Sequence, residues 1–140
     1  MADAGAKVFV TGRNPDRVRA LAKVCGGTPV LLEHCSAGHY DVLVHATSLG
    51  MWPETGRSLF DGAIPAGIVF DLVYNPHETL LLKQARQQGC ETIHGIEMFV
   101  EQASEQFQLF TGVSAPRQVM ERAAVEALAS HHHNHRGDCE

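Results

Sequence analysis

The sequence predicts a doubly wound α/β fold, in which a mainly parallel sheet carries helices on both faces. Short apolar runs rich in β-branched residues alternate with segments of helical periodicity along the 140 residues. Parallel strands need crossover connections of the length that such helices provide, so the alternation indicates successive βαβ units. Glycine and proline stand at most of the boundaries, where they end one element and begin the next.

The N-terminal part is expected to hold a strand, a helix and a short strand. Residues 6–11 (AKVFVT) have the β-branched and aromatic content of a buried strand. Asn14-Pro15 is typical of an N-cap followed by proline at the first helical position, and a glycine pair ends this helix after about Cys25. Residues 29–33 are expected to form a short strand.

The rest of the chain continues the alternation. The run GIVFDLV is the strongest strand signal, and single glycines stand beyond the ends of two of the helices. We expect strands at 40–46, 67–73 and 90–93, and helices at 78–88, 96–111 and 116–129.

Composition narrows the class of function. With 44% hydrophobic and 19% charged residues, residues 1–129 are expected to form one domain, and the His-rich tail 130–140 a disordered end with no catalytic role. The net charge of −5 without a basic face argues against nucleic acid. No apolar run approaches the ~20 residues of a membrane span, so a cytoplasmic location is expected. The four cysteines lack CxxC spacing, which predicts neither disulfides nor a metal site.

Polar clusters follow the expected strands, where open α/β sheets bind their ligands. The clusters are the segment 11–17, the turn HATSLGM at 45–51, Tyr74-Asn-Pro and Gly95. In dinucleotide-binding folds, an arginine at the tip of the second strand accommodates the 2′-phosphate of NADP. Arg13 stands at such a place and Arg17 lies one helical turn further on; the alternative is a pair of solvated arginines at a helix start.

The glycine-rich loop GxGxxG of a complete dinucleotide domain does not occur in this sequence. We therefore expect the chain to start within the cofactor domain and to lack its first βα unit. In the strand order 3-2-1-4-5-6 the missing strand is central, which would leave two apolar edges. Those edges are expected either to pair directly or to associate in a homodimer.

Four segments in order resemble the C-terminal half of shikimate dehydrogenase, and together they cover the chain to about residue 128. They are VFVTGRNPDRVRALA, HATSLGM, DLVYNPHETLLL, and GIEMFVEQA with the downstream Phe107 and Gly112. The resemblance implies a Rossmann-like fold, NADP as cofactor, and reversible reduction of 3-dehydroshikimate to shikimate.

The resemblance also implies roles for particular positions. The family's Asn-Arg-Thr motif for adenosine falls on Gly12-Arg13-Asn14, where the arginine is kept and the residues before and after it differ from the motif. The family's Asn-Ala-Thr-Ser turn has become His45-Ala-Thr-Ser. The implied cofactor contacts are Gly12, Arg13, Asn14, Arg17, Thr47, Ser48, Leu72, Gly95 and Met98, with Met51 near the nicotinamide; the implied substrate contacts are Tyr74 and Gln102.

Simpler interpretations of several positions stay open. Tyr74 could cap its strand, Gln102 could face solvent, and Met98 could be a packing residue. His45 fits a core or rim histidine, and Asp71 fits a carboxylate that orders the neighbouring turn through backbone amides.

The resemblance places the catalytic Lys and Asp pair in an N-terminal substrate lobe, so no catalytic residue is assigned here. We expect the 140 residues alone to be inactive with shikimate, and the N-terminal lobe of the same enzyme to be the partner. The alternative is a non-catalytic nucleotide-binding or dimerisation module derived from the same fold.

Overall fold

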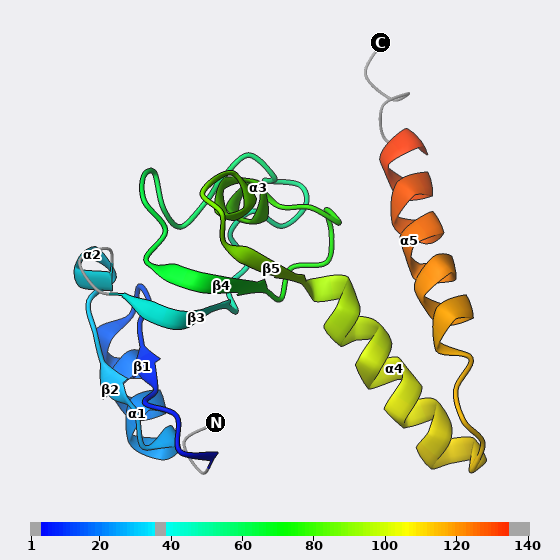
Figure 1. The fold of residues 1–140 in the computed structure, drawn as a ribbon, viewed down its shortest axis with the longest axis horizontal. Coiled ribbons are helices and arrows are strands. Elements are labelled where there is room, and N and C mark those ends of the chain that lie inside the picture. The colour runs from blue at the N-terminus through cyan, green and yellow to red at the C-terminus, as the bar shows by residue number, and fades with distance from the viewer. Residues whose placement is uncertain (1–3, 36–38, 135–140) are drawn as a thin grey trace. The chain divides into compact units, whose positions relative to one another are not determined.

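The computed structural model describes residues 4–35 and 39–134 (Figure 1). The chain divides into two compact units, Met1–Tyr40 and Asp41–Glu140, and each is described by itself. Among the described residues, no helix is long and apolar enough to cross a membrane.

The first unit contains a two-stranded parallel sheet and the helix that packs on it. The strands are β1 (Phe9–Val10) and β2 (Thr28–Pro29), with Phe9 opposite Thr28, and α1 (Pro15–Cys25) connects them. Val18 and Ala22 are the buried residues of α1. The ring of Tyr40 meets Phe9 edge-on at 5.4 Å, and desolvation, followed by the neighbouring Cys35, raises the pKa of Tyr40.

The expected helix in this unit is confirmed and the expected second strand is wrong beyond Pro29. Gly26 closes α1 in the left-handed conformation, with φ 64°, and its amide donates to the Ala22 carbonyl. Residues 32–35 form a short helix, α2 (Leu32–Cys35), in place of the expected strand. The Cys35 side chain is buried and its Sγ lies 3.6 Å from the Leu31 carbonyl oxygen, a spacing of four that suits a helical turn.

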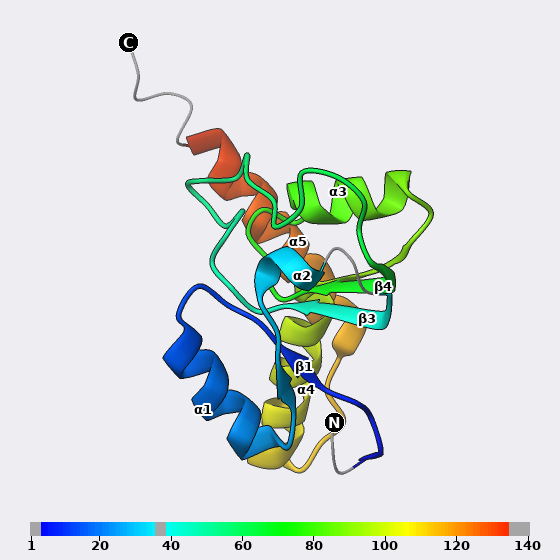
Figure 2. The same cartoon turned by 90° about the vertical axis from the view of Figure 1, so that its left-hand side faces the viewer.

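The second unit is built on a three-stranded sheet in the order β3–β4–β5. Its strands are β3 (Tyr40–His45), which begins at the boundary between the units, β4 (Ala66–Asp71) and β5 (Glu91–His94). β4 and β5 run parallel, with Asp71 opposite His94. Helix α3 (Leu80–Gln87) buries Leu81 and Leu82 against the sheet, and Figure 2 shows α3 and α4 on opposite sides of it.

Two long helices complete the second unit. α4 (Gly95–Thr111) and α5 (Arg117–Asn134) lie side by side and run in opposite directions, as Figure 1 shows. An Arg117–Glu101 ion pair joins them. α5 runs past its expected end at residue 129, because neither glycine nor proline interrupts the segment before Gly137. Cys139 and the rest of 135–140 lie outside the described residues.

The described strands form one sheet in each unit, and direct pairing of the first strand with the strand at residue 40 stays a prediction. β1 pairs with β2, and β3 pairs with β4. The parallel α/β architecture is the one that the sequence predicts. Association between copies of the chain stays a prediction.

Candidate functional site

The first part of the candidate site lies at the N-terminal end of α1. The Asn14 side chain caps this helix, since its Oδ1 accepts the amides of Asp16 at 3.0 Å and Arg17 at 3.1 Å. Arg13 and Arg17 are exposed, and within the described ranges neither forms an ion pair. Arg19, by contrast, is paired with Asp16 at 2.5 Å.

The backbone around these arginines is closely packed. A Cβ atom at Gly12 would lie 3.2 Å from Val18 Cγ2. Thr11 Oγ1 is buried and lacks a hydrogen-bond partner among the residues that the structure describes. A helix N-terminus attracts anions, and guanidinium groups match the geometry of a phosphate ester. This end of α1 is therefore suited to a phosphate group.

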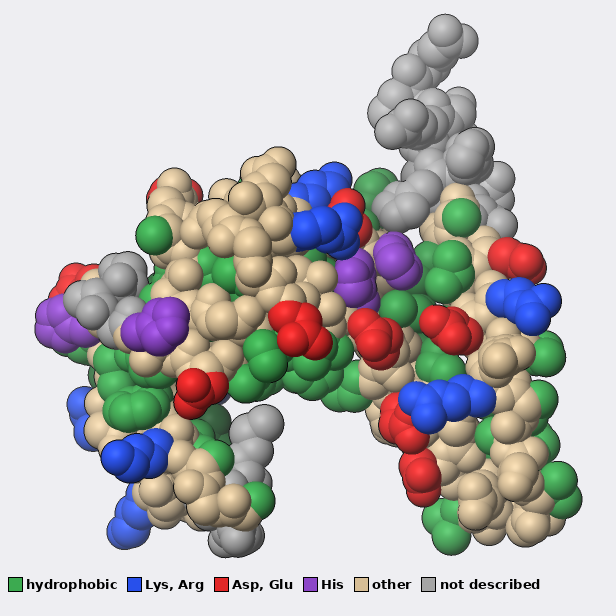
Figure 3. Space-filling view, in the orientation of Figure 1, with side chains coloured by type: hydrophobic (Ala, Val, Ile, Leu, Met, Phe, Trp, Pro, Cys, Tyr) green, Lys and Arg blue, Asp and Glu red, His purple; other side chains and the backbone are tan. Residues whose placement is uncertain are grey.

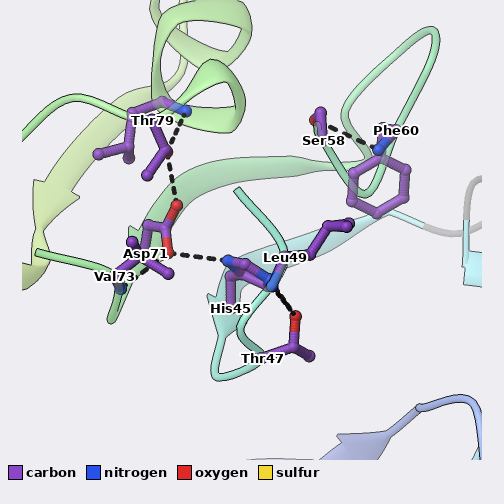
Figure 4. A network of polar contacts seen from close by, with 9 residues as sticks. His45, Thr47, Leu49, Ser58, Phe60, Asp71, Val73 and Thr79 are labelled. Atoms are coloured by element: carbon purple, nitrogen blue, oxygen red, sulfur yellow. Dashed lines mark hydrogen bonds and ion pairs between the residues drawn. The ribbon is translucent and has the colours of Figure 1, made fainter. Parts of the chain in front are cut away.

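The second part of the site lies at the carboxyl ends of β3 and β4. His45 ends β3 with only 2% of its side chain exposed, and both of its ring nitrogens are engaged (Figure 4). Nδ1 lies 2.8 Å from Asp71 Oδ1, and Nε2 lies 2.6 Å from Thr47 Oγ1. Thr47 also accepts the Leu49 amide at 3.2 Å. The turn after β3 is thus fixed to the core through one histidine.

Asp71 is the centre of this network and is fully buried. Besides His45, its Oδ1 accepts the Val73 amide at 3.0 Å, and its Oδ2 accepts the Thr79 hydroxyl at 2.6 Å. Thr79 in turn caps α3 by accepting the Leu82 amide. The carboxylate therefore orders the turn after β4, as the sequence suggested, and it also ties β3 to the start of α3.

The structure places Leu72 and Gly95, two of the implied cofactor contacts, next to each other. A Cβ atom at Gly95 would lie 2.6 Å from the Leu72 carbonyl oxygen and 2.7 Å from that of Val73. Only a residue without a side chain lets α4 begin this close to the end of β4. The amino end of α4 therefore lies directly beside the turn that leaves β4.

Exposed side chains surround this point. The Tyr74 and Phe99 rings stack with centroids 5.2 Å apart and are 44% and 43% exposed. Met98 is 39% exposed, so it is not a core residue, and Gln102 and Ser48 are exposed as well. The Trp52 amide donates a hydrogen bond to the Asn75 carbonyl oxygen at 2.9 Å, which joins the loop after β3 to the loop after β4.

Two further histidines lie near the start of α4. The rings of His77 and His94 stack with centroids 5.0 Å apart. Figure 3 shows, in purple, histidine side chains on one face of the molecule. The His94 amide donates to Glu97 Oε1, which caps α4. Within the described part of the chain, no group of three or more His, Cys, Asp or Glu side chains could hold a metal ion.

The His45–Asp71–Thr79 network was not predicted as a unit. The available signal was two ionisable residues, His45 and Asp71, at the ends of otherwise apolar strand runs. Such residues are rarely buried unless they are paired. Thr79 gave no signal, because the helix was expected to begin one residue before it.

Comparisons with known proteins agree with the motifs. Residues 95–125 match the family model of the shikimate 5′-dehydrogenase C-terminal domain. A shikimate dehydrogenase (NADP(+)) from Maridesulfovibrio salexigens is 36% identical over 125 residues, which cover 87% of this chain and 46% of that protein. The chain thus spans about half the length of such relatives.

Solved structures give the same result. A shikimate 5-dehydrogenase from Thermus thermophilus, in complex with NADP(H) and shikimate, matches 90% of this chain and 48% of its own, with a TM-score of 0.77 and 34% identity. A quinate dehydrogenase from Corynebacterium glutamicum in complex with NAD matches with a TM-score of 0.71 and 35% identity, over 83% of this chain and 45% of its own. Over most of its length, the chain is similar to the C-terminal half of shikimate dehydrogenases.

Proposed function

We propose that this chain is the NADP-binding part of a shikimate dehydrogenase, which reversibly reduces 3-dehydroshikimate to shikimate. The observation that supports the cofactor assignment most directly is a pair of exposed cations at the amino end of α1. They are Arg13 and Arg17, which lack an ion-pair partner among the described residues. A 2′-phosphate adds a doubly charged group to the adenosine, and these two side chains would neutralise it.

The residues present fit the dinucleotide. In the first unit, the absence of a side chain at Gly12 lets the chain lie close to Val18 of α1. Asn14 caps the helix through its side-chain oxygen, and among the described residues its NH₂ group has no partner, so it could bind a ligand. The Thr11 hydroxyl, which has no partner among the described residues, supplies one further polar group. We assign the adenosine end of NADP to this group of residues.

In the second unit, the proposed contacts on the nicotinamide side are Thr47, Ser48, Leu72, Gly95 and Met98, and those to the substrate are Tyr74 and Gln102. The nicotinamide, when bound, supplies the hydride. The residues of this chain would bind and orient the two reactants, and Tyr74 and Phe99 would shield them from water. Proton transfer is assigned to an N-terminal lobe, which is also the expected partner. A homodimer and a cytoplasmic location are further predictions.

Calorimetric titration of the purified chain with NADP and with NAD tests the cofactor assignment. We expect tighter binding of NADP, and a loss of about 10- to 100-fold in Arg13→Ala, because a hydrogen bond to a charged group contributes about 1.5–3 kcal/mol. Arg19→Ala is the matched control, since it removes the same charge from the first turns of α1 at a side chain already paired with Asp16. Equal affinities for NADP and NAD, or equal losses in both variants, would contradict the proposal.

The activity assay separates binding from turnover. With shikimate or quinate and NADP, the purified chain is expected to show binding without turnover. Turnover would overturn the assignment of proton transfer to another lobe. If neither dinucleotide bound, the non-catalytic module would replace the NADP-binding part as the best description.

A further inference from the structure

Tyr74 is one of the proposed substrate contacts, and its side chain is in contact with the ring of Phe99. The two rings stack with centroids 5.2 Å apart and an interplanar angle of 26°. Among the residues that the structure describes, the Tyr74 hydroxyl has no hydrogen-bond partner. The hydroxyl is therefore free to bind a ligand, and the stack with Phe99 is the contact that restricts the ring.

The backbone on both sides of Tyr74 is held against the start of α4. Before Tyr74, the Leu72 carbonyl oxygen lies where a Cβ atom at Gly95 would be only 2.6 Å away. After Tyr74, the His77 carbonyl oxygen lies 3.1 Å from His94 Nδ1, and these two imidazole rings stack. Both contacts fix the main chain of the turn relative to α4, so the remaining freedom of Tyr74 is rotation of its side chain.

The same helix places the Phe99 ring. Phe99 follows Gly95 by four residues, about one turn into α4, so the two residues share a face of the helix. This is the face that approaches Leu72, and the close approach of Gly95 therefore sets the position of Phe99 beside the turn. Phe99 is 43% exposed, so burial in the core does not account for its position, whereas the stack on Tyr74 does.

We propose that Phe99 is a positioning residue, which holds the Tyr74 ring in one rotamer so that its hydroxyl is ready to bind a hydroxylated ring acid. The inference deepens the proposed function, on which it rests for the identity of the substrate. Without the stack, the substrate would have to order the Tyr74 side chain when it binds, and binding would weaken. An aromatic pair changes an equilibrium constant by about 2- to 12-fold, which sets the size of the expected loss.

The first test follows Tyr74 by NMR without a ligand. The chain has two tyrosines, and Tyr40 meets a different ring, that of Phe9, so it serves as an internal reference. In the wild-type chain, Hα–Hβ couplings should report a single χ1 rotamer of Tyr74, and the Phe99 ring should shift the Tyr74 ring protons upfield. Phe99→Leu should average the rotamers and remove the shift, whereas Phe99→Tyr should retain both. Averaged rotamers in the wild-type chain, or an unchanged Tyr74 in Phe99→Leu, would overturn the proposal.

The second test measures shikimate binding by calorimetry in the presence of NADP. Phe99→Leu should bind shikimate about 2- to 12-fold more weakly than the wild-type chain, and Phe99→Tyr should recover the affinity. Phe110→Leu is the matched control, because it makes the same change near the far end of α4, at a side chain that is 82% exposed. Its affinity should equal that of the wild-type chain. Equal losses in Phe99→Leu and Phe110→Leu would overturn the proposal.

A double-mutant cycle separates positioning from direct contact with the substrate. If Phe99 acts through the Tyr74 hydroxyl, Phe99→Leu should cause no further loss of shikimate affinity in the Tyr74→Phe background. An equal fold-loss in both backgrounds would overturn the proposal, because Phe99 would then act independently of that hydroxyl. If shikimate bound to none of the proteins, the substrate of the proposed function would be wrong, whereas a single Tyr74 rotamer that depends on Phe99 would still support the positioning role.

Discussion

Replacement of Asp71 by alanine should destabilise the chain more than any surface substitution. The change leaves three buried donors without their acceptor: the His45 Nδ1–H, the Val73 amide and the Thr79 hydroxyl. Each buried donor left without a partner costs about 1–3 kcal/mol, and the Thr79 hydroxyl can rotate to relieve its share. We expect a loss of roughly 3–5 kcal/mol, a large part of the 5–15 kcal/mol typical of a domain.

Urea unfolding followed by circular dichroism measures this loss. Asp71→Asn keeps one acceptor oxygen in the same volume and should cost about 1–2 kcal/mol, and Asp61→Ala, at an exposed position, less than about 0.5 kcal/mol. Thr79→Val should cost less in the Asp71→Ala background than alone, because the two residues share a hydrogen bond. An Asp71→Ala variant within about 1 kcal/mol of wild type would refute the reasoning.

Two further substitutions test the packing and capping that hold the site. Gly95→Ala places a Cβ atom 2.6 Å from the Leu72 carbonyl oxygen and should cost about 2–3 kcal/mol in urea unfolding. A Cβ atom at Gly62 would have no other atom within 4 Å, so Gly62→Ala should change the free energy of unfolding by under about 0.5 kcal/mol. Equal effects of Gly95→Ala and Gly62→Ala would contradict the close approach of Gly95 to Leu72. Asn14→Ala removes the acceptor of two α1 amides and should lower the free energy of unfolding by about 1 kcal/mol. Asn14→Ser should recover most of this loss. An unchanged unfolding midpoint in Asn14→Ala would argue against the cap.

Local sequence signals predicted the helices because the residues that start and stop them act through their own backbone. Asn14-Pro15 and Gly26 bound α1, and Gly112 ends α4 in the left-handed conformation, with φ 70°. The same reasoning missed α2, since a single helical turn is too short to show a periodicity.

The sequence predicted only part of the candidate site. It missed the interactions that join residues far apart along the chain. Leu72 and Gly95 were each expected as cofactor contacts, and the structure places them next to each other. The His45–Asp71 hydrogen bond joins residues 26 positions apart, and nothing in the local sequence specifies it. Both residues are buried because β3 and β4 are neighbours in the sheet, which the local sequence does not specify.

Trp52 gives the molecule a spectroscopic reporter of its own. It is the single tryptophan of the chain, it is 42% exposed, and its amide holds the loop after β3 to the Asn75 carbonyl. All indole emission therefore originates from one loop beside Tyr74 and the Thr47 turn. Reduced nicotinamide absorbs light where indole emits, so a dinucleotide bound there would quench this emission by energy transfer, and occupancy could be followed in the unlabelled chain.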